Sequence, residues 1–289
     1  MKREVTELEL LSPHAALLIH KGSEKTAVIS DLHIGWEVPL AEEGIHVPSQ
    51  TGRLLERLKQ LILSEKPDRL LVLGDIKHAI ANIRLEEWRD VPFFFEEACK
   101  IVSRVQVLPG NHDGNLEALL PESVEVLSPR GVVLGDVGLF HGHMWPDPEL
   151  LGCRTLVVGH VHPVVVFKDP IGFRIARQVW VRAPCEGRLL ARSMLKHHNV
   201  RLKRGANPQD VLRTEFNVSL GVENLLVMPS FNDFLGGKAV NRSTVARERK
   251  FREFIGPVLR SGSVNLKKAE VYLLDGTFLG SLDLLSKIG

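Results

Sequence analysis

The sequence predicts an α/β fold, and two observations lead to that prediction. In the first half of the chain, short apolar runs alternate with amphipathic stretches, as in proteins whose strands alternate with helices. After residue 163 the apolar runs are short and closely spaced, which indicates a strand-rich second half. Two mixed sheets packed face to face would hold all of these strands in a single domain covering residues 1–289. A chain of 289 residues, 44% of them hydrophobic, can bury the core that such a fold requires.

The first predicted elements are a hairpin and a helix. Residues 15–20 and 26–30 are apolar and flank the turn-like sequence KGSE, so they predict a β-hairpin. Residues 48–66 carry Leu and Ile at helical spacing, which predicts an amphipathic helix that ends at Pro67. A second hairpin is predicted late in the chain, with its turn at Asp275-Gly276. Further apolar runs predict strands at residues 69–74, 105–110, 137–142, 155–160 and 225–231.

Residues 85–102 have the pattern of a helix that contains a proline. Because proline lacks the backbone N–H that a helix interior uses, Pro92 predicts a break or a restart. The aromatic residues of this segment, Trp88 and Phe93 to Phe95, are expected in the core.

Charge and cysteine content exclude several classes of protein. The net charge of +2 does not make the whole molecule a polyanion binder. Cys99, Cys153 and Cys185 lie far apart, which argues against a disulfide scaffold and against a cysteine zinc site. The N-terminal MKREVTELELL has acidic residues where a secretory signal has an apolar core, and no apolar run reaches the roughly 18 residues of a membrane span. We therefore expect a cytoplasmic protein that does not bind membranes.

Polar side chains follow the predicted strands at the point where each strand ends. They are Asp31 and His33, Asp75, Asn111 and His112, His141, and His160 and His162. The carboxyl ends of strands in an open α/β sheet border the crevice where ligands bind, so we expect these side chains to converge. Glycines stand beside most of them, at positions 74, 110, 142 and 159, and would let the backbone approach closely.

This set of donors favours a pair of transition-metal ions. Without His112, which adjoins a ligand and need not be one, two Asp, one Asn and four His offer hard oxygens and imidazole nitrogens without a thiolate, which suits Mn²⁺, Fe or Zn²⁺ better than Ca²⁺ or Cu(I). Seven protein ligands exceed what one ion uses, whereas two ions that share a carboxylate would use them all. Paired ions about 3.5–4 Å apart clamp the attacking and leaving oxygens of an in-line phosphoryl displacement. The alternative for any single Asp or His is a cap or a polar turn, but that explanation would have to apply independently at every strand end.

The motifs resemble those of a known superfamily. Asp31-x-His33, Gly74-Asp75, Gly110-Asn111-His112, His141-Gly142 and Gly159-His160-x-His162 are similar, in content and order, to the signature of the calcineurin-like metallophosphoesterases. The resemblance covers about residues 26–163 and implies a four-layer αββα sandwich of two mixed sheets flanked by helices. SDLHIGWE, GDIKH, RAPC and VMPSFNDFLGG further resemble the archaeal branch related to SbcD/Mre11 nucleases and to ligase-associated phosphoesterases.

The resemblance also assigns roles. It implies one metal ion on Asp31, His33 and His162, a second on Asn111, His141 and His160, and Asp75 as the bridge between them. A hydroxide shared by the two ions, expected to be Mn²⁺ with Fe or Zn²⁺ as alternatives, would attack phosphorus. His112 would protonate the departing oxygen, and Asp113 would orient His112.

Two further histidines have a functional and a structural interpretation. His78 stands where Mre11-type nucleases carry a histidine that handles the phosphodiester backbone, but Lys77 replaces the aromatic residue that usually precedes it. The alternative is a surface pair at the rim. His143 is expected to orient His141 or a water molecule, with a plain structural role as the alternative.

The basic residues concentrate in a polar segment, about residues 188–220, that resembles an insertion or excursion from the domain. Candidate nucleic-acid contacts within it are Arg192, Lys196, Arg201, Lys203 and Arg204. A second basic run covers residues 242–252. Basic stripes next to a phosphoesterase site would attract polyanions, whereas the alternative is a solvated surface.

The sequence thus predicts a di-metal phosphoesterase that hydrolyses phosphodiesters or phosphomonoesters. One alternative keeps the chemistry and makes the substrate DNA or RNA, as in an SbcD-like nuclease. Another makes the chain a protein-binding scaffold without catalysis, which the complete set of ligands disfavours.

Overall fold

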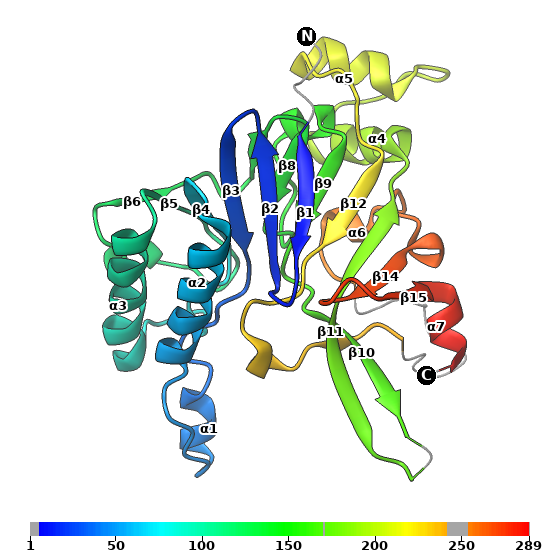
Figure 1. Ribbon diagram of the computed structural model, residues 1–289. Helices are drawn as coiled ribbons and strands as arrows, with labels where there is room; N and C mark the ends of the chain where they lie inside the picture. The colour runs from blue at the N-terminus through cyan, green and yellow to red at the C-terminus, as the bar shows by residue number, and fades with distance from the viewer. Residues whose placement is uncertain (1–5, 170, 242–253, 289) are drawn as a thin grey trace.

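The computed structural model describes residues 6–169, 171–241 and 254–288. Within these residues the chain forms two mixed sheets that pack face to face, with helices on both outer faces (Figure 1). The predicted αββα sandwich is therefore confirmed.

The first sheet follows the order of the sequence. It contains β1 (Glu7–Leu11), β2 (Ala16–Lys21), β3 (Glu24–Ile29), β4 (Arg69–Leu73), β5 (Arg104–Leu108) and β6 (Val124–Val126). Strands β2 and β3 form the predicted antiparallel hairpin, and β3 to β6 run parallel. Parallel neighbours need crossover connections, which contain α1 (Val38–Glu42), α2 (Thr51–Glu65), α3 (Leu85–Ile101) and the 3₁₀ turn η1 (Leu116–Leu119).

The second sheet holds the strand-rich half of the chain. Its path is β13-β10-β11-β12-β9-β8-β7, and β14 joins it by pairing with β11 and with β15. The bounds are β7 (Val132–Leu134), β8 (Val137–Phe140), β9 (Thr155–Val158), β10 (Pro163–Lys168), β11 (Arg174–Pro184), β12 (Asn224–Val227), β13 (Lys238–Ala239), β14 (Glu270–Leu273) and β15 (Phe278–Ser281). Strands β8, β9 and β12 run parallel, so their carboxyl ends also share one edge.

The remaining helical elements lie in the second half of the chain. They are α4 (Gly187–His197), α5 (Pro208–Phe216), α6 (Pro257–Arg260), α7 (Leu282–Ile288), η2 (Pro148–Gly152), η3 (Asp233–Leu235) and η4 (Leu266–Lys268). The basic segment at 188–220 therefore contains α4 and α5, and the apolar face of α4 packs into the core through Leu190 and Met194. None of the helices in the described part of the chain has the length and apolar content to cross a membrane.

The alternation of side chains along β4 shows how the four layers pack. Leu70 and Val72 join the core under α2 and α3, whereas Leu71 and Leu73 join the core between the two sheets. The fully buried Trp180 lies in this inter-sheet core as well.

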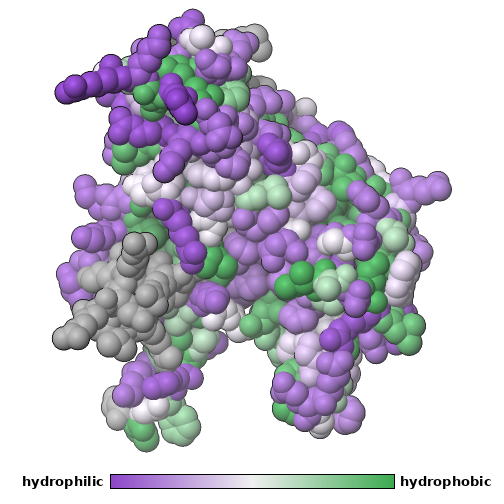
Figure 2. All heavy atoms as spheres, turned by 180° about the vertical axis from the view of Figure 1, so that it is seen from behind, coloured by the Kyte–Doolittle hydropathy of each residue, from purple (hydrophilic) through white to green (hydrophobic). Residues whose placement is uncertain are grey.

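Two parts of the molecule project beyond the sheets on the same side. They are α1 and the β10–β11 hairpin, which lie at the bottom of Figure 1. Figure 2, seen from behind, shows an open hollow between these projections. Since α1 begins five residues after His33 and β10 directly follows His162, the segments that carry the predicted ligands lie between the bases of the two projections.

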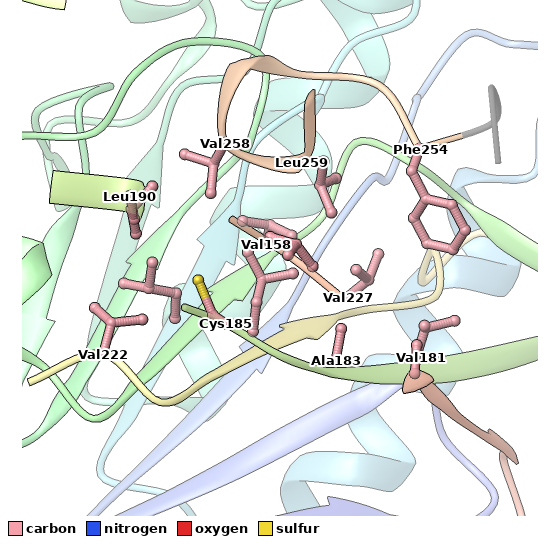
Figure 3. Close-up of a cluster of buried hydrophobic side chains, with 14 of the residues drawn as sticks. Val158, Val181, Ala183, Cys185, Leu190, Val222, Val227, Phe254, Val258 and Leu259 are labelled. Carbon is pink, nitrogen blue, oxygen red and sulfur yellow. The ribbon is translucent and has the colours of Figure 1, made fainter. Parts of the chain in front are cut away.

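Strands and helices both contribute side chains to the core on the outer face of the second sheet. Figure 3 shows Val158, Val181 and Val227 of neighbouring strands facing Leu190 of α4 and Val258 of α6. This packing fixes β9 and therefore the loop that follows it.

Helix α3 differs from the prediction in two respects. It continues through Pro92 without a break. Its buried face holds Phe94 and Phe95, but Trp88 and Phe93 are 49% and 46% exposed, so the prediction that these two lie in the core was wrong. The buried positions recur three and four residues apart, and Trp88 and Phe93 fall outside the two edges of the buried face.

Candidate metal centre

The predicted ligand segments meet at the carboxyl ends of the parallel strands. The backbone N–H of Asp31, after β3, donates to the carbonyl of Gly74 at 3.0 Å, and that of His33 donates to the carbonyl of Asp75 at 2.9 Å. The His160 N–H, after β9, donates to both carboxylate oxygens of Asp31 at 3.2 Å. Segments far apart in the sequence are thus connected directly by hydrogen bonds.

The side chains form two groups that could each hold a metal ion. One contains Asp31, His33, Asp75 and His162, the other contains Asp75, His141 and His160, and the donor atoms in each group lie within 4.8 Å of one another. Asp75 belongs to both groups. Its Oδ2 atom lies 3.4 Å from His33 Nε2 and 3.3 Å from His141 Nε2.

Several atoms at this centre that could bind a metal ion have no hydrogen-bond partner among the described residues. These buried atoms are Nε2 of His33, His141 and His162 and Oδ1 of Asn111. His162 Nε2 lies 3.0 Å from Asp31 Oδ1, but its orientation is not that of a hydrogen bond. Buried polar atoms in proteins are nearly always satisfied, so unsatisfied imidazole nitrogens aimed at carboxylates fit a site for cations.

The centre combines ionised carboxylates with two histidines whose pKa values shift in opposite directions. Burial raises the pKa of the Asp75 carboxyl, but His141 and His33 outweigh burial and hold it well below its usual range. Burial opposes protonation of His141, yet Asp75 raises its pKa to about 9. Burial, followed by the charge of His141, lowers the pKa of His160 to about 4. Ionised, buried carboxylates at the centre attract cations.

The backbone at the centre is unusual. Asp31, His33, Asp75, His160 and His162 all have positive φ, between 44° and 66°. This left-handed conformation is uncommon for residues other than glycine, and it persists where the surrounding structure imposes it, often at functional sites. Here it turns the side chains of consecutive ligands toward the same point.

Two glycines are required by close approach. A Cβ atom on Gly110 would lie 2.3 Å from Asp75 Oδ1, and one on Gly159 would lie 1.9 Å from Ser30 Oγ. No side chain could occupy either position without displacing a residue of the centre. The predicted close approach of the backbone at these glycines therefore requires the absence of a Cβ atom, and not a positive φ.

His112 lies at the edge of the centre, where the structure orients it differently from the prediction. Its Nδ1 contacts the carbonyl of His78, and its Nε2 lies 4.0 Å from Asp75 Oδ2. Among the described residues, no hydrogen bond joins the Asp113 carboxylate to the His112 ring. Instead it accepts hydrogen bonds from the N–H groups of Gly110 at 2.7 Å, Ile76 at 2.9 Å and Lys77 at 3.2 Å. Asp113 thus connects the loops after β4 and β5.

His78 faces the centre, whereas Lys77 does not lie at the surface. His78 Nδ1 lies 3.3 Å from His33 Nδ1, and burial lowers the pKa of His78 to about 4. The Lys77 side chain is fully buried and donates to the carbonyl of Ala79, so the alternative of a surface pair is wrong for Lys77.

His143 lies next to the second group without a hydrogen bond to it. Its ring centroid is 5.4 Å from that of His141 and 6.2 Å from that of His160. Its Nδ1 is buried and has no partner among the described residues.

The basic residues are not brought to the centre. Arg192 and Lys196 lie on α4, and Arg201, Lys203 and Arg204 lie in the loop that follows it. In Figure 1, α4 and α5 occupy the end of the molecule opposite to α1. The basic run at 242–252 lies outside the described residues.

Sequence reasoning missed residues that support the centre from behind. The Ser30 hydroxyl donates to Asp31 Oδ2 at 2.6 Å. The Asn232 side chain donates to the carbonyl of Leu32 at 2.9 Å. Glu87, fully buried, accepts from the N–H groups of His78 at 3.0 Å and Ala79 at 2.7 Å. An acid on the apolar face of α3 was the signal that could have identified Glu87.

The family of the chain follows from comparison with known proteins. Residues 24–164 match the family model of the calcineurin-like phosphoesterases, and this range includes all of the predicted ligands. These residues form a calcineurin-like phosphoesterase domain. This superfamily is metal-dependent, which agrees with the Asp/His cluster. Comparison with curated proteins gives no match.

Three solved structures resemble this chain at low sequence identity. A nuclease MPE from Pseudomonas putida is 18% identical, with a TM-score of 0.49, over 94% of this chain and 98% of that one. The protein of unknown function AQ665 from Aquifex aeolicus is 20% identical, with a TM-score of 0.33, over 47% and 78%. The phosphoesterase YfcE from E. coli is 22% identical, with a TM-score of 0.32, over 50% and 73%.

Proposed function

We propose that this chain hydrolyses phosphodiester or phosphomonoester bonds at a centre of two divalent metal ions. The observation that supports the proposal is the position of Asp75, whose Oδ2 atom lies within 3.4 Å of His33 and 3.3 Å of His141 and thus belongs to both ligand groups. The residues that would hold the ions are Asp31, His33, Asp75 and His162 for one, and Asp75, Asn111, His141 and His160 for the other.

The chemistry would be divided between the ions and the protein. Two bound cations would supply a nucleophile at neutral pH and neutralise charge on the phosphate oxygens. His112 would serve as the proton donor, because the His78 carbonyl holds its Nδ1 and leaves Nε2 4.0 Å from Asp75. Asp113 would maintain the distance between the loops of Asp75 and His112.

The proposal also includes the identity of the metal, the branch of the superfamily and the cellular setting. Imidazole and carboxylate donors without thiolate support Mn²⁺, with Fe and Zn²⁺ as alternatives. His78 beside the centre supports a place in the SbcD-related branch. The free thiols of Cys99 and Cys185 support a cytoplasmic setting.

A second candidate function is nucleic-acid cleavage. The observation that favours it is the His78 ring, whose Nδ1 lies 3.3 Å from that of His33. A neutral imidazole there could contact a phosphate oxygen of a bound strand. Cleavage of oligonucleotides by the metal-loaded protein would test this candidate.

The test of the proposal uses small substrates and a matched variant. The purified protein with Mn²⁺ is expected to hydrolyse bis-p-nitrophenyl phosphate or p-nitrophenyl phosphate and to contain two metal equivalents. Asp75→Asn is expected to lose activity and metal, whereas Asp210→Asn, at an exposed position on α5, keeps both. Inactivity on both substrates with Mn²⁺, Fe²⁺ and Zn²⁺ would refute the proposal. A protein-binding scaffold predicts that outcome together with the absence of bound metal.

A further inference from the structure

The surface of α4 and the loop after it forms a basic hollow, separate from the metal centre. Its volume is about 930 Å³, and its lining includes Arg192, Lys196, Arg201, Lys203 and Arg204. These are the residues in which the sequence predicted nucleic-acid contacts. The structure gathers them around a single concave surface.

The fold places the five cations together through the end of α4. Arg192 and Lys196 are exposed and one helical turn apart, on the face opposite to the buried Leu190 and Met194. Asn199 adopts the left-handed conformation at φ 59° and ends the helix. The chain then folds back, because the N–H of Val200 donates to the carbonyl of Leu195 at 2.9 Å. This reversal brings residues 201–204 toward the side of α4 that carries the two cations.

The charge of the hollow is not compensated locally. No acidic residue lines it, and none of its five cations forms an ion pair with a described residue. Like charges on one surface repel one another and oppose folding. Their concentration around a concave surface is explained by a ligand that brings negative charge.

The lining also specifies what kind of anion fits. The volume is near the upper end of the roughly 300–1,000 Å³ range of small-ligand pockets, larger than a single phosphate group needs. No aromatic side chain lines the hollow, so it offers no platform on which a base could stack. Contacts from Arg and Lys to phosphates position a nucleic acid without reading its sequence.

We propose that this hollow binds the phosphate backbone of a nucleic-acid strand, independently of sequence, and that the strand is the substrate of the metal centre. The second part rests on the proposed function. Because α4 and α5 lie at the end of the molecule opposite to α1, the strand must extend around the body to reach both sites (Figure 1). Figure 2 shows the strongly hydrophilic side chains of the α4–α5 region at the top of the molecule.

Binding is tested without catalysis and with matched charge changes. Fluorescence anisotropy of labelled DNA of about 30 nucleotides, single-stranded and duplex, is measured in EDTA between about 50 and 200 mM salt. The test variant combines Arg201→Gln, Lys203→Gln and Arg204→Gln. The control combines Lys21→Gln, Lys66→Gln and Lys267→Gln, which removes the same charge from exposed positions elsewhere.

The control is expected to bind each DNA as tightly as the wild type does. Binding by both proteins is expected to depend steeply on salt. The test variant is expected to bind at least about tenfold more weakly, and the slope of log K against log salt for the single strand is expected to fall by about 2, since each lost phosphate contact removes about 0.7. Unrelated sequences of the same length are expected to bind equally.

The proposal is overturned if the wild type binds neither DNA or if the test variant binds as tightly as the control. Displacement of the DNA by an equal charge concentration of poly-glutamate would also overturn it, because the hollow would then recognise any polyanion. Hydrolysis of bis-p-nitrophenyl phosphate separates this proposal from the function on which it rests. The test variant is expected to retain that activity, and its loss of oligonucleotide cleavage alone would identify the strand as substrate.

Discussion

Replacement of Glu87 tests how the loop of His78 is held. Glu87 is fully buried, and its carboxylate accepts hydrogen bonds from three backbone N–H groups, those of His78 at 3.0 Å, Ala79 at 2.7 Å and Arg84 at 2.9 Å. In Glu87→Gln, one carboxylate oxygen becomes an NH₂ group that cannot accept. At least one of these N–H groups then loses its acceptor, and the others keep only a neutral one.

The magnitude follows from that lost bond. A hydrogen bond to a charged group contributes about 1.5–3 kcal/mol, so we expect the free energy of unfolding to fall by that amount in Glu87→Gln. In Glu87→Ala the N–H groups of Ala79 and Arg84 both lose their acceptor, whereas His78 keeps the carbonyl of Ile34 at 3.0 Å. Two unsatisfied donors at about 1–3 kcal/mol each predict a loss of about 2–6 kcal/mol.

Urea denaturation of the metal-free protein measures both variants. With a slope of about 3 kcal/mol per M, Glu87→Gln is expected to lower the midpoint by about 0.5–1 M. The matched control is Glu86→Gln, which changes the same residue type one position earlier in the first turn of α3 and is expected to stay within about 0.5 kcal/mol of wild type. Equal midpoints for Glu87→Gln and Glu86→Gln would show that the carboxylate does not hold the loop.

Three further predictions concern the glycines, the metal and the thiols. Gly110→Ala is expected to abolish metal binding and to cost about 1–3 kcal/mol of stability, because its Cβ would lie 2.3 Å from Asp75 Oδ1. Gly114→Ala, whose Cβ would have no neighbour closer than 3.6 Å, serves as the control, and similar metal content in the two variants would contradict the reasoning. Mn²⁺ at 100 times its dissociation constant is expected to stabilise the wild type by about 2.7 kcal/mol in thermal unfolding, and an equal gain in Asp75→Asn would remove Asp75 from the site. Alkylation at pH 8 is expected to label Cys99 alone in the folded protein, since Cys99 is half-buried whereas burial raises the pKa of the Cys185 thiol to about 11; rapid labelling of Cys185 would disprove this.

The strands and the order of their polar ends could be predicted because both depend on local sequence. An apolar run followed by Asp or His marks a strand end, and parallel strands bring such ends to one edge whatever the connections contain. The helix at 48–66 could also be predicted, from the helical spacing of its Leu and Ile residues. The structure places it at Thr51–Glu65, with Lys66 as the C-cap before Pro67.

Other features depend on contacts that the local sequence does not encode. Pro92 does not break α3, because the carbonyl that loses its partner belongs to Trp88, which lies on the exposed face where water can replace the missing N–H. Adjacency in the sequence suggested that Asp113 serves His112, but the fold offers Asp113 three backbone donors from two loops. The distance of Arg201 and its neighbours from the centre follows from the side of the sheets on which α4 packs, which charge patterning does not determine.

Each ligand group takes side chains from both sheets. Asp31, His33 and Asp75 follow strands of the first sheet, whereas His141 and His162 follow or precede strands of the second. An ion held by either group would therefore fix the alignment of one sheet on the other. The free energy of ion binding would then be coupled to the packing between the two sheets. Truncation of Trp180, which lies in the inter-sheet core and outside the centre, would therefore weaken the binding of the cations.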